Sequence, residues 1–339
     1  MQIERLLVVG YGSIGQRHLR IARSLLPDAD IRVMRHRPCE TTPELANGCM
    51  SSIAEAIAFA PQAAVIANPA TLHVQVACPL AERGVHLLIE KPLADTPHAV
   101  ADLPAVCRAQ GVVLMTAYNL RFAPSLQRFR DEVQNGRIGK VISVRCEIGQ
   151  YLPSWRPGSD YREGVSASRA LGGGVLLELS HEIDYLRWIF GDVAVVNAVL
   201  SQQSDLQVDV EDTAHLVLSF TPDTNGRRLR ANLSMDFVRQ DTTRTCVAIG
   251  ESGSLRWNAL SGTVEYFPAG ATVWENVFVH APQRDETYLA EWRHFLACVN
   301  AGTQPVTSGE DGLAALKIIE AARASAEMQG ASAAVGGWQ

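Results

Sequence analysis

The sequence predicts an α/β domain with a parallel sheet, followed by an α+β domain built on one open sheet. Short apolar runs alternate with helical patterns over the first 120 residues, and long alternating strands dominate afterwards. The length of 339 residues corresponds to about two domains. An apolar share of 47% beside 19% charged residues supplies a sizeable core, which excludes a mainly disordered chain.

The first domain reads as a repeated strand, turn and helix. Ser52 and Glu55 form a capping box that starts one helix, and Gly84 ends the next. The predicted strands are 6–9, 31–34, 63–67, 85–89 and 112–116. The predicted helices are 14–26, 52–59, 72–83 and 97–110, the last with a kink at Pro104. This alternation implies right-handed crossovers and a doubly wound parallel sheet covered on both faces.

The second domain begins where this alternation stops, so we expect domains at 1–121 and 122–330 and a frayed tail at 331–339. Residues 149–174 form a long irregular loop, and loops of this length are usually functional or disordered. The sequence Asp223–Gly226 predicts a hairpin turn. The predicted strands are 141–148, 193–203, 212–220, 229–237, 245–250, 255–258 and 264–268, and the predicted helices are 176–190, 286–300 and 308–328.

Composition and charge exclude several classes of partner. The net charge of −6 repels phosphate backbones, so nucleic-acid binding is not expected. No apolar run approaches the roughly 18 residues that span a bilayer, and the N-terminus lacks signal-peptide features, which predicts a cytoplasmic protein without a membrane partner. The seven cysteines are widely spaced without a Cys-x-x-Cys, which argues against a disulfide framework or a metal site.

A glycine-rich turn follows the first strand and opens the first helix. Its residues are Gly10, Tyr11, Gly12, Ser13, Ile14 and Gly15. In this context the glycines allow a tight turn, close approach of the backbone to a pyrophosphate, and close helix–strand packing. Free N–H groups and the helix dipole then favour the phosphates. The alternative is a tight strand-to-helix turn without a ligand, but the context favours dinucleotide binding.

The residues after the second strand bear on the choice of cofactor. An NAD site usually has an acidic residue about 20 positions beyond the glycines. Here that region reads Arg35, His36 and Arg37. Arginine can pair bidentately with a 2′-phosphate, which favours NADP over NAD. The alternative is that these are solvated cations and that NAD binds through other contacts.

Two further clusters carry side chains suited to proton transfer. Glu90, Lys91 and Pro92 follow a buried strand, at the edge where open α/β sheets bind ligands. A lysine there could exchange a proton with a hydroxyl, although alone this tripeptide could be a surface turn. After three glycines, Glu178, His181 and Asp184 are spaced by three and would share a helix face. That pattern could equally be a helix start with one satisfied histidine.

In this order and spacing, these motifs resemble the glucose–fructose oxidoreductase / inositol dehydrogenase / rhizopine-catabolism family over nearly the whole chain. The stretches 67–73, 118–122 and 308–312 look like further family motifs. The resemblance implies a Rossmann domain and a second domain with a large open, mainly antiparallel sheet that often forms homodimers or homotetramers. It also implies hydride transfer between nicotinamide C4 and a carbinol carbon of a sugar, cyclitol or sugar derivative.

The resemblance assigns roles to particular residues. Lys91 and His181 would be the acid/base pair, with Asp184 holding a substrate hydroxyl or orienting His181. Many relatives have a catalytic aspartate four residues before the histidine, and the nearest candidate for that role here is Glu178, which stands three residues before His181. Further cofactor contacts would come from Asn68, Pro69, Leu72, His73, Glu90 and Asn119. Substrate contacts would come from Tyr118, Arg121, Trp155, Arg156, Tyr161 and Arg169.

The loop around Trp155 suggests what kind of substrate is bound. It looks most like family members associated with bacterial surface-glycan and acidic-sugar synthesis. Trp155 and Tyr161 could stack on a sugar, while Arg156, Arg162 and Arg169 could hold a carboxylate or phosphate. The alternative is a loop ordered by packing its own aromatic rings.

Two other functions remain open on the sequence. One is a sensor or regulator that binds the cofactor and a sugar without turnover, although such a protein need not keep both Lys91 and His181. The other is a reductase of the same fold that acts on a non-sugar substrate. The arginines and the polar loop favour a hydrophilic anionic substrate instead.

Overall fold

The computed structural model describes residues 3–36, 41–100 and 102–336. The chain divides into two compact units. Unit 1 comprises Met1–Asn119 and Tyr288–Leu316, and unit 2 comprises Leu120–Thr287 and Lys317–Gln339. A segment near the C-terminus therefore belongs with the N-terminal unit, a grouping that a single boundary at residue 121 does not make.

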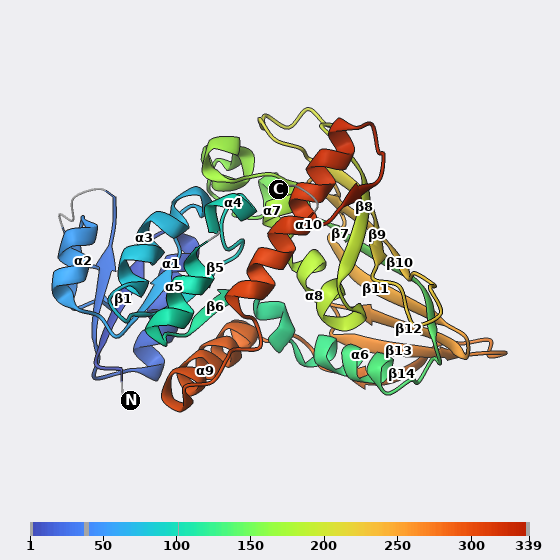
Figure 1. Cartoon of the computed structure of the whole chain (residues 1–339), viewed down its shortest axis with the longest axis horizontal. Helices are drawn as coiled ribbons and strands as arrows, with labels where there is room; N and C mark the ends of the chain where they lie inside the picture. Colours follow the sequence, from blue (N-terminus) through green and yellow to red (C-terminus); the bar gives the residue numbers. More distant parts are fainter. Residues whose placement is uncertain (1–2, 37–40, 101, 337–339) are drawn as a thin grey trace. The chain divides into compact units, whose positions relative to one another are not determined.

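Unit 1 is built on a parallel sheet with the strand order β3-β2-β1-β4-β5-β6. Figure 1 labels β1, β5 and β6 of this sheet. The sheet confirms the predicted doubly wound α/β domain. The chain reverses its direction of travel across the sheet between β1 and β4, which is where open α/β sheets bind ligands. The strands are β1 (Arg5–Val9), β2 (Asp30–Met34), β3 (Gly48–Met50), β4 (Ala63–Ile66), β5 (His86–Glu90) and β6 (Leu114–Ala117). β3 was not predicted, because three residues give no periodic signal.

The helices of unit 1 begin and end largely as the sequence signals predict. They are α1 (Ser13–Leu25), α2 (Ile53–Phe59), α3 (His73–Ala81), α4 (Pro97–Val100), α5 (Leu103–Gln110) and α9 (Glu286–Ala301). The Ser52 hydroxyl accepts the Glu55 N–H at 3.2 Å, and the Glu55 carboxylate accepts the Ser51 N–H at 2.8 Å. The N-terminus of α2 is therefore capped by two hydrogen bonds in opposite directions. The predicted kinked helix 97–110 is instead two helices, with Pro104 in the first turn of α5.

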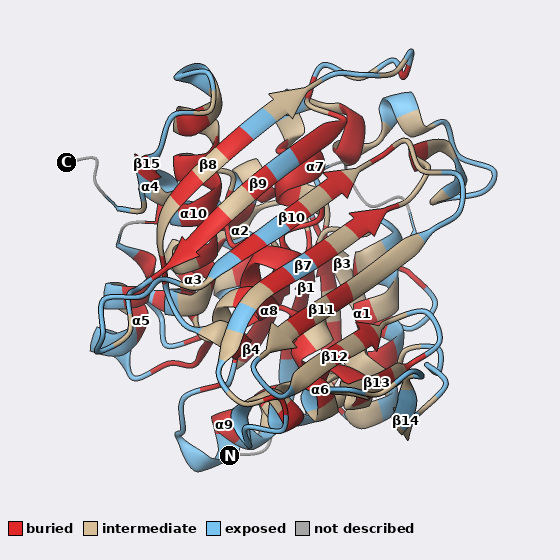
Figure 2. Ribbon diagram, turned by 90° about the vertical axis from the view of Figure 1, so that its right-hand side faces the viewer, coloured by how far each residue is buried: buried red, intermediate tan, exposed pale blue. Residues whose placement is uncertain are grey.

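Unit 2 is built on a second sheet, with the strand order β14-β13-β12-β11-β7-β10-β9-β8-β15. Only the β7–β10 pair is parallel, which confirms the predicted mainly antiparallel sheet. Buried and more exposed residues alternate along β9 and β10 (Figure 2), as expected for a sheet with one face on the core. The strands are β7 (Val141–Gly149), β8 (Val193–Ser201), β9 (Thr213–Phe220), β10 (Arg230–Asp236), β11 (Thr243–Gly250), β12 (Gly253–Asn258), β13 (Thr263–Pro268), β14 (Glu275–Val279) and β15 (Ala333–Ala334).

The helices of unit 2 pack against the buried face of this sheet. They include α6 (Pro124–Gln134), α7 (Val175–Glu178), α8 (His181–Phe190) and the C-terminal part of α10 (Gly309–Glu327). Trp257 of β12 is fully buried, lies edge-on to Tyr185 of α8 at 5.3 Å, and donates its indole N–H to Ser125 of α6 at 3.0 Å. This one side chain therefore joins both helices to the sheet.

Several features of unit 2 differ from expectation or refine it, and α6 and β14 lie where no element was predicted. The predicted helix 176–190 is interrupted at Leu179 and Ser180, which separates α7 from α8. The predicted frayed tail contributes β15, which pairs with β8. The predicted hairpin turn joins β9 to β10, and the Asp223 carboxylate accepts the N–H groups of Asn225 and Arg227 at 2.9 Å.

The cysteines of the described residues differ in oxidation state. Cys49 is disulfide-bonded, whereas Cys78, Cys107, Cys146, Cys246 and Cys298 are free. Burial raises the pKa of the Cys107 thiol to about 12, which makes it a poor nucleophile. Within the described ranges, no helix combines the length and the apolar character needed to cross a membrane.

Candidate active site

The glycine turn connects β1 to α1, and each glycine meets a different constraint. Gly10 has a φ of +89°, and a Cβ there would lie 2.6 Å from the Ala67 carbonyl oxygen. A Cβ on Gly15 would lie 2.2 Å from the Gly10 oxygen. A Cβ on Gly12 would meet nothing within 4 Å. Packing therefore requires glycine at two positions, while Gly12 leaves open space beside a helix start that has no side-chain cap. This arrangement fits a bound pyrophosphate.

Arg35 directly follows β2, at the same edge of the sheet as the glycine turn. Its guanidinium lies 5.3 Å from the ring centre of Tyr11, which places a cation beside the turn. His36, the next residue, is exposed. Arg37, which the sequence also suggests as a cofactor residue, lies outside the described residues. The position after β2 is therefore held by a cation where an NAD site usually has a carboxylate.

The loop after β4 lies against the glycine turn. Asn68 follows Ala67, and its side-chain oxygen is buried without a hydrogen-bond partner. His73 is almost completely buried, and its ring nitrogens lie 2.8 Å from the Asn68 carbonyl and 3.3 Å from the Leu93 carbonyl. Burial lowers the pKa of His73, although the neighbouring carbonyls oppose this. His73 thus connects two loops of the site, while Pro69 is half-buried and Leu72 is exposed at its edge.

Glu90 and Lys91 stand at the end of β5. The Glu90 carboxylate accepts the Lys91 backbone N–H at 3.1 Å and lies 2.7 Å from Nε2 of His18, a buried residue of α1. Burial alone raises the pKa of Glu90, but the hydrogen bond from His18 and the nearby Lys91 charge outweigh it and lower the pKa. Glu90 is therefore ionised at neutral pH, and it anchors the main chain of Lys91.

The α7–α8 break changes the relation among three predicted residues. Glu178 ends α7, whereas His181 begins α8 and Asp184 lies one turn later. The three do not share the face of one continuous helix, contrary to the expectation from their spacing. Within unit 2, His181 is half-buried and Glu182 beside it is fully buried, with an oxygen 2.8 Å from Arg244 Nε. The first turn of α8 is thus fixed to β11.

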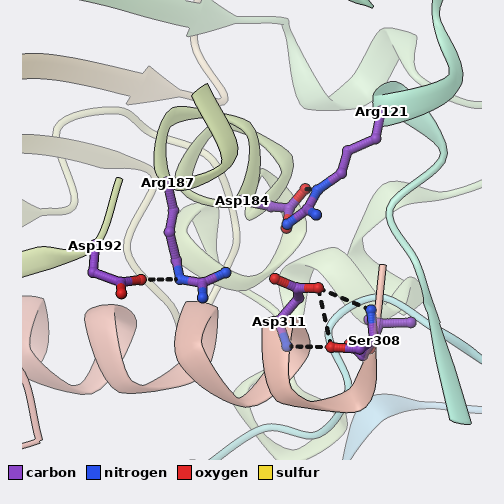
Figure 3. A network of polar contacts seen from close by, with 7 residues as sticks. Arg121, Asp184, Arg187, Asp192, Ser308 and Asp311 are labelled. Atoms are coloured by element: carbon purple, nitrogen blue, oxygen red, sulfur yellow. Dashed lines mark hydrogen bonds and ion pairs between the residues drawn. The ribbon is translucent and has the colours of Figure 1, made fainter. Parts of the chain in front are cut away.

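Asp184 and Arg121 form a buried ion pair in unit 2. The guanidinium donates to both carboxylate oxygens, at 2.8 and 2.6 Å, as Figure 3 shows. Trp188 lies over the Arg121 guanidinium, 5.5 Å from its ring centre. Because each partner engages the other bidentately, the pair fastens the short helix η2 (Asn119–Phe122) to α8. Both carboxylate oxygens of Asp184 are thus occupied by Arg121, and the Arg121 guanidinium is occupied by Asp184. In unit 1, Tyr118 is fully buried and Asn119 nearly so.

The loop between β7 and α7 encloses a cavity of about 450 Å³ within unit 2. Trp155, Arg156 and Tyr161 line it, together with Asp160, Glu163 and backbone of the same loop. Trp155 lies edge-on to Phe237 at 5.2 Å and donates to the Gln150 carbonyl at 3.0 Å. The loop therefore packs some of its own aromatic surface, while leaving a concave space of ligand size.

The three arginines of this loop are not equivalent. Arg162 pairs with Asp160, and this guanidinium lowers the pKa of Asp160 to about 2. Arg169 donates to the Asp209 carbonyl and does not line the cavity. Arg156 is exposed at the cavity. It is therefore the arginine best placed to bind an anionic group.

Comparison with known proteins decides the family. The model "Oxidoreductase family, NAD-binding Rossmann fold" matches residues 5–118. The model "Oxidoreductase family, C-terminal alpha/beta domain" matches residues 130–333. The chain belongs to this glucose–fructose oxidoreductase / inositol dehydrogenase / rhizopine-catabolism family. It is an NAD(P)-dependent oxidoreductase, as the resemblance in the sequence implies.

Individual members of this oxidoreductase family share only a modest part of the sequence with this chain. Levoglucosan dehydrogenase of Pseudarthrobacter phenanthrenivorans is 34% identical over 142 residues, which are 40% of this chain and 35% of that protein. Myo-inositol 2-dehydrogenase of Thermotoga maritima is 25% identical over 288 residues, covering 78% of this chain and 77% of that protein. A solved levoglucosan dehydrogenase in complex with NADH is 23% identical, covers 98% of both chains and has a TM-score of 0.84, which shows a shared fold.

Sequence reasoning missed the residues beneath Lys91 in this family member. His18, Glu291 and Trp292 are fully buried in unit 1 and face Glu90 or one another. A histidine in an amphipathic helix gives no local signal of its partner, because Trp292 lies 274 residues away. Among the described residues, no group of three or more His, Cys, Asp or Glu side chains could hold a metal ion.

Proposed function

We propose that this oxidoreductase transfers a hydride between nicotinamide C4 and a carbinol or ketone carbon of a sugar, cyclitol or sugar derivative. The observation that carries the proposal is the position of Lys91. It follows β5, and the glycine turn follows β1 of the same sheet. The names of two relatives, levoglucosan dehydrogenase and myo-inositol 2-dehydrogenase, support a polyhydroxylated substrate.

The residues of unit 1 would hold the cofactor and move a proton. The α1 N-terminus and Gly12 would bind the pyrophosphate, and the unpartnered Asn68 oxygen could accept an amide N–H of the nicotinamide half. When bound, the nicotinamide accepts or donates the hydride. Lys91 would exchange the proton at the reacting oxygen. His181, in unit 2, is proposed for proton transfer from the sequence resemblance, with Asp184 as its positioning residue and no assigned role for Glu178.

We propose NADP as the preferred cofactor. Arg35 supports this, because its guanidinium occupies the position after β2 and lies beside Tyr11, where it could pair with a 2′-phosphate. We expect Arg35→Ala to weaken NADPH binding about tenfold or more and to change NADH binding little. Titration of both cofactors against wild type and variant, followed by NAD(P)H fluorescence, measures this. Equal losses for both cofactors would contradict the preference.

The substrate proposal extends to an anionic group. Arg156 at the loop cavity supports a carboxylate or phosphate on the sugar, and the Trp155 and Tyr161 rings support stacking on a sugar face. A thermal-shift panel of neutral sugars, uronic acids and nucleotide sugars, each with NADP present, tests this. Stabilisation by acidic sugars that is lost in Arg156→Ala is expected. Equal stabilisation by neutral and acidic sugars would remove the anionic group from the proposal.

The catalytic proposal is tested with Lys91→Ala. We expect kcat to fall by roughly two to four decades while cofactor affinity stays near that of wild type. Activity that survives this change would refute the role of Lys91. A sensor without turnover is the second candidate function. It predicts that no sugar of the panel changes the absorbance of bound NAD(P)H near 340 nm, even where the sugar stabilises the protein.

We also propose a homodimer or homotetramer formed through the large sheet of unit 2. Support comes from the exposed side chains Val199, His215 and Asn232, which lie on three neighbouring strands of that sheet. Light scattering of the purified protein, compared with a variant carrying Val199→Lys, tests this. A mass equal to one chain in wild type would contradict it.

A further inference from the structure

A chain of buried hydrogen bonds lies beneath Lys91 in unit 1. We propose that His18 and Trp292 are positioning residues for Lys91, because together they fix the Glu90 carboxylate that holds the Lys91 main chain. The inference rests on the proposed role of Lys91. It adds two residues, from α1 and α9, that the motifs in the sequence do not include.

The geometry of this chain is continuous. The Trp292 indole N–H donates to Nδ1 of His18 at 2.9 Å. Nε2 of His18 lies 2.7 Å from one Glu90 oxygen, and the other Glu90 oxygen accepts the Lys91 N–H at 3.1 Å. The His18 ring is fully buried and lies between Tyr288, at 6.0 Å, and Trp292, at 5.9 Å between ring centres. Packing thus holds the ring in one orientation.

The direction of each hydrogen bond follows from the chemistry of the partners. An indole N–H can only donate, so Nδ1 of His18 must accept. The ring proton then resides on Nε2, which donates to Glu90. Trp292 therefore selects the histidine tautomer that can bind the carboxylate. Without the indole, the ring could carry its proton on Nδ1 and present a lone pair to Glu90, or it could take up a second proton.

The charges around Glu90 explain why the donors matter. The groups that face Glu90 are Lys91 just after β5, His18 on α1, His73 on α3, and Tyr288 and Glu291 on α9. Glu291 is fully buried without a hydrogen-bond partner, and burial, together with the Glu90 charge, raises its pKa well above its usual value. Glu90 is thus the ionised carboxylate of the pair, and its charge acts on Lys91.

The contribution of this chain is geometric and electrostatic. A buried carboxylate that loses a donor pays a large desolvation cost and becomes easier to protonate. Protonation of Glu90 would remove the negative charge beside Lys91 and weaken its hold on the Lys91 N–H. The Lys91 side chain would then lose both a neighbouring charge and a fixed main chain. His18 and Trp292 therefore act on Lys91 through Glu90 without touching substrate.

The positioning role can be measured without a substrate. The protein contains three lysines, Lys91, Lys140 and Lys317. The apo protein is treated with trace acetic anhydride at several pH values, and the acetylation of each lysine is quantified by mass spectrometry. The rate for Lys91 relative to the other two lysines reports the surroundings and the exposure of its amine. Lys140 and Lys317 serve as controls within each molecule.

Three variants and one matched control complete the experiment. His18→Leu removes the donor to Glu90, and Trp292→Phe removes the donor to His18 while keeping a ring. We expect each to increase the relative rate of Lys91 at a fixed pH, by about threefold to tenfold for His18→Leu and less for Trp292→Phe. His18→Gln retains an N–H donor and should fall between wild type and His18→Leu. Trp257→Phe removes a buried indole hydrogen bond in unit 2 and should leave the relative rate unchanged.

The outcomes separate this inference from the proposed function. An unchanged relative Lys91 rate in folded Trp292→Phe and His18→Gln would overturn the positioning role, even if His18→Leu failed to fold. An equal change in Trp257→Phe would overturn it too, because the effect would then follow from any lost indole bond. Failure of the proposed function would instead appear as enzyme activity that survives the substitution Lys91→Ala. That result would leave the acetylation rates as they are.

Discussion

Glu291 gives a prediction whose sign and size follow from its surroundings. It lies on α9, is 0% exposed, and neither carboxylate oxygen has a hydrogen-bond partner. Burial, and then the negative charge of Glu90, raise its pKa well above the usual 4.5. The folded protein therefore keeps a proton on Glu291 that the unfolded chain loses above about pH 4.5. We expect Glu291→Gln, a neutral side chain of similar shape, to stabilise the protein at neutral pH.

The size follows from proton linkage. Where the folded state binds one more proton than the unfolded state, the free energy of unfolding falls by about 1.4 kcal/mol for each pH unit. The stabilisation from the raised pKa is fully present below the unfolded pKa and is lost as pH rises through the folded pKa. Glu291→Gln should thus match wild type near pH 4.5 and gain on it by up to about 1.4 kcal/mol per unit above. For a chain of this size that is roughly 2 °C in Tm per pH unit.

The assay compares thermal unfolding of the two proteins between pH 4.5 and 8. Glu44→Gln is the matched control, because Glu44 is an exposed carboxylate of the same unit. Its Tm difference from wild type should not vary with pH. A constant Tm difference for Glu291→Gln across this range would refute the reasoning. So would a Tm difference of the opposite sign, which would mean that Glu291 is ionised and paired in the folded protein.

Two further predictions follow from contacts in the structure. Gly15→Ala should destabilise unit 1, since the new Cβ would lie 2.2 Å from the Gly10 oxygen. Gly12→Ala should fold normally and weaken NADP binding about tenfold or more. Thermal unfolding and fluorescence titration distinguish the two variants, and normal folding of both would contradict this prediction. Asp184→Asn should cost about 3–5 kcal/mol in unfolding free energy, because it leaves the buried Arg121 charge without its counter-ion. In urea titrations, Arg121→Met with Asp184→Leu should recover much of that loss, and a double variant as unstable as Asp184→Asn would argue against charge as the cause.

Much of the fold was predictable because its signals are local. Alternating strands and helices, the glycine turn after β1, and the capping pairs Ser52–Glu55 and Ser308–Asp311 are each written within a few residues. The Ser308 hydroxyl accepts the Asp311 N–H at 3.2 Å and the Asp311 carboxylate accepts the Ser308 N–H at 2.9 Å, and Figure 3 draws both contacts. The position of Lys91 after β5 was also predictable, since residues that end parallel strands share one edge of the sheet.

Local signals failed where several conformations satisfy the same pattern. Glu178, His181 and Asp184 have helical spacing, yet the chain leaves the helix at Leu179 and Ser180 and starts it again at His181. β15 has only two residues and exists because β8 offers it an edge for pairing. In both cases the apolar pattern of the sequence is compatible with the observed local structure. Contacts with distant strands and helices decide which local structure forms.

The sequence by itself determined most of the strands and helices, the dinucleotide turn and the place of Lys91, because short-range sterics and hydrophobic periodicity specify them. Only the tertiary structure decided which charges pair. It joins Arg121 to Asp184 across 63 residues and His18 to Trp292 across 274. Burial makes these choices, because a polar group removed from water must find a partner, and the partner is set by the packing of the whole unit.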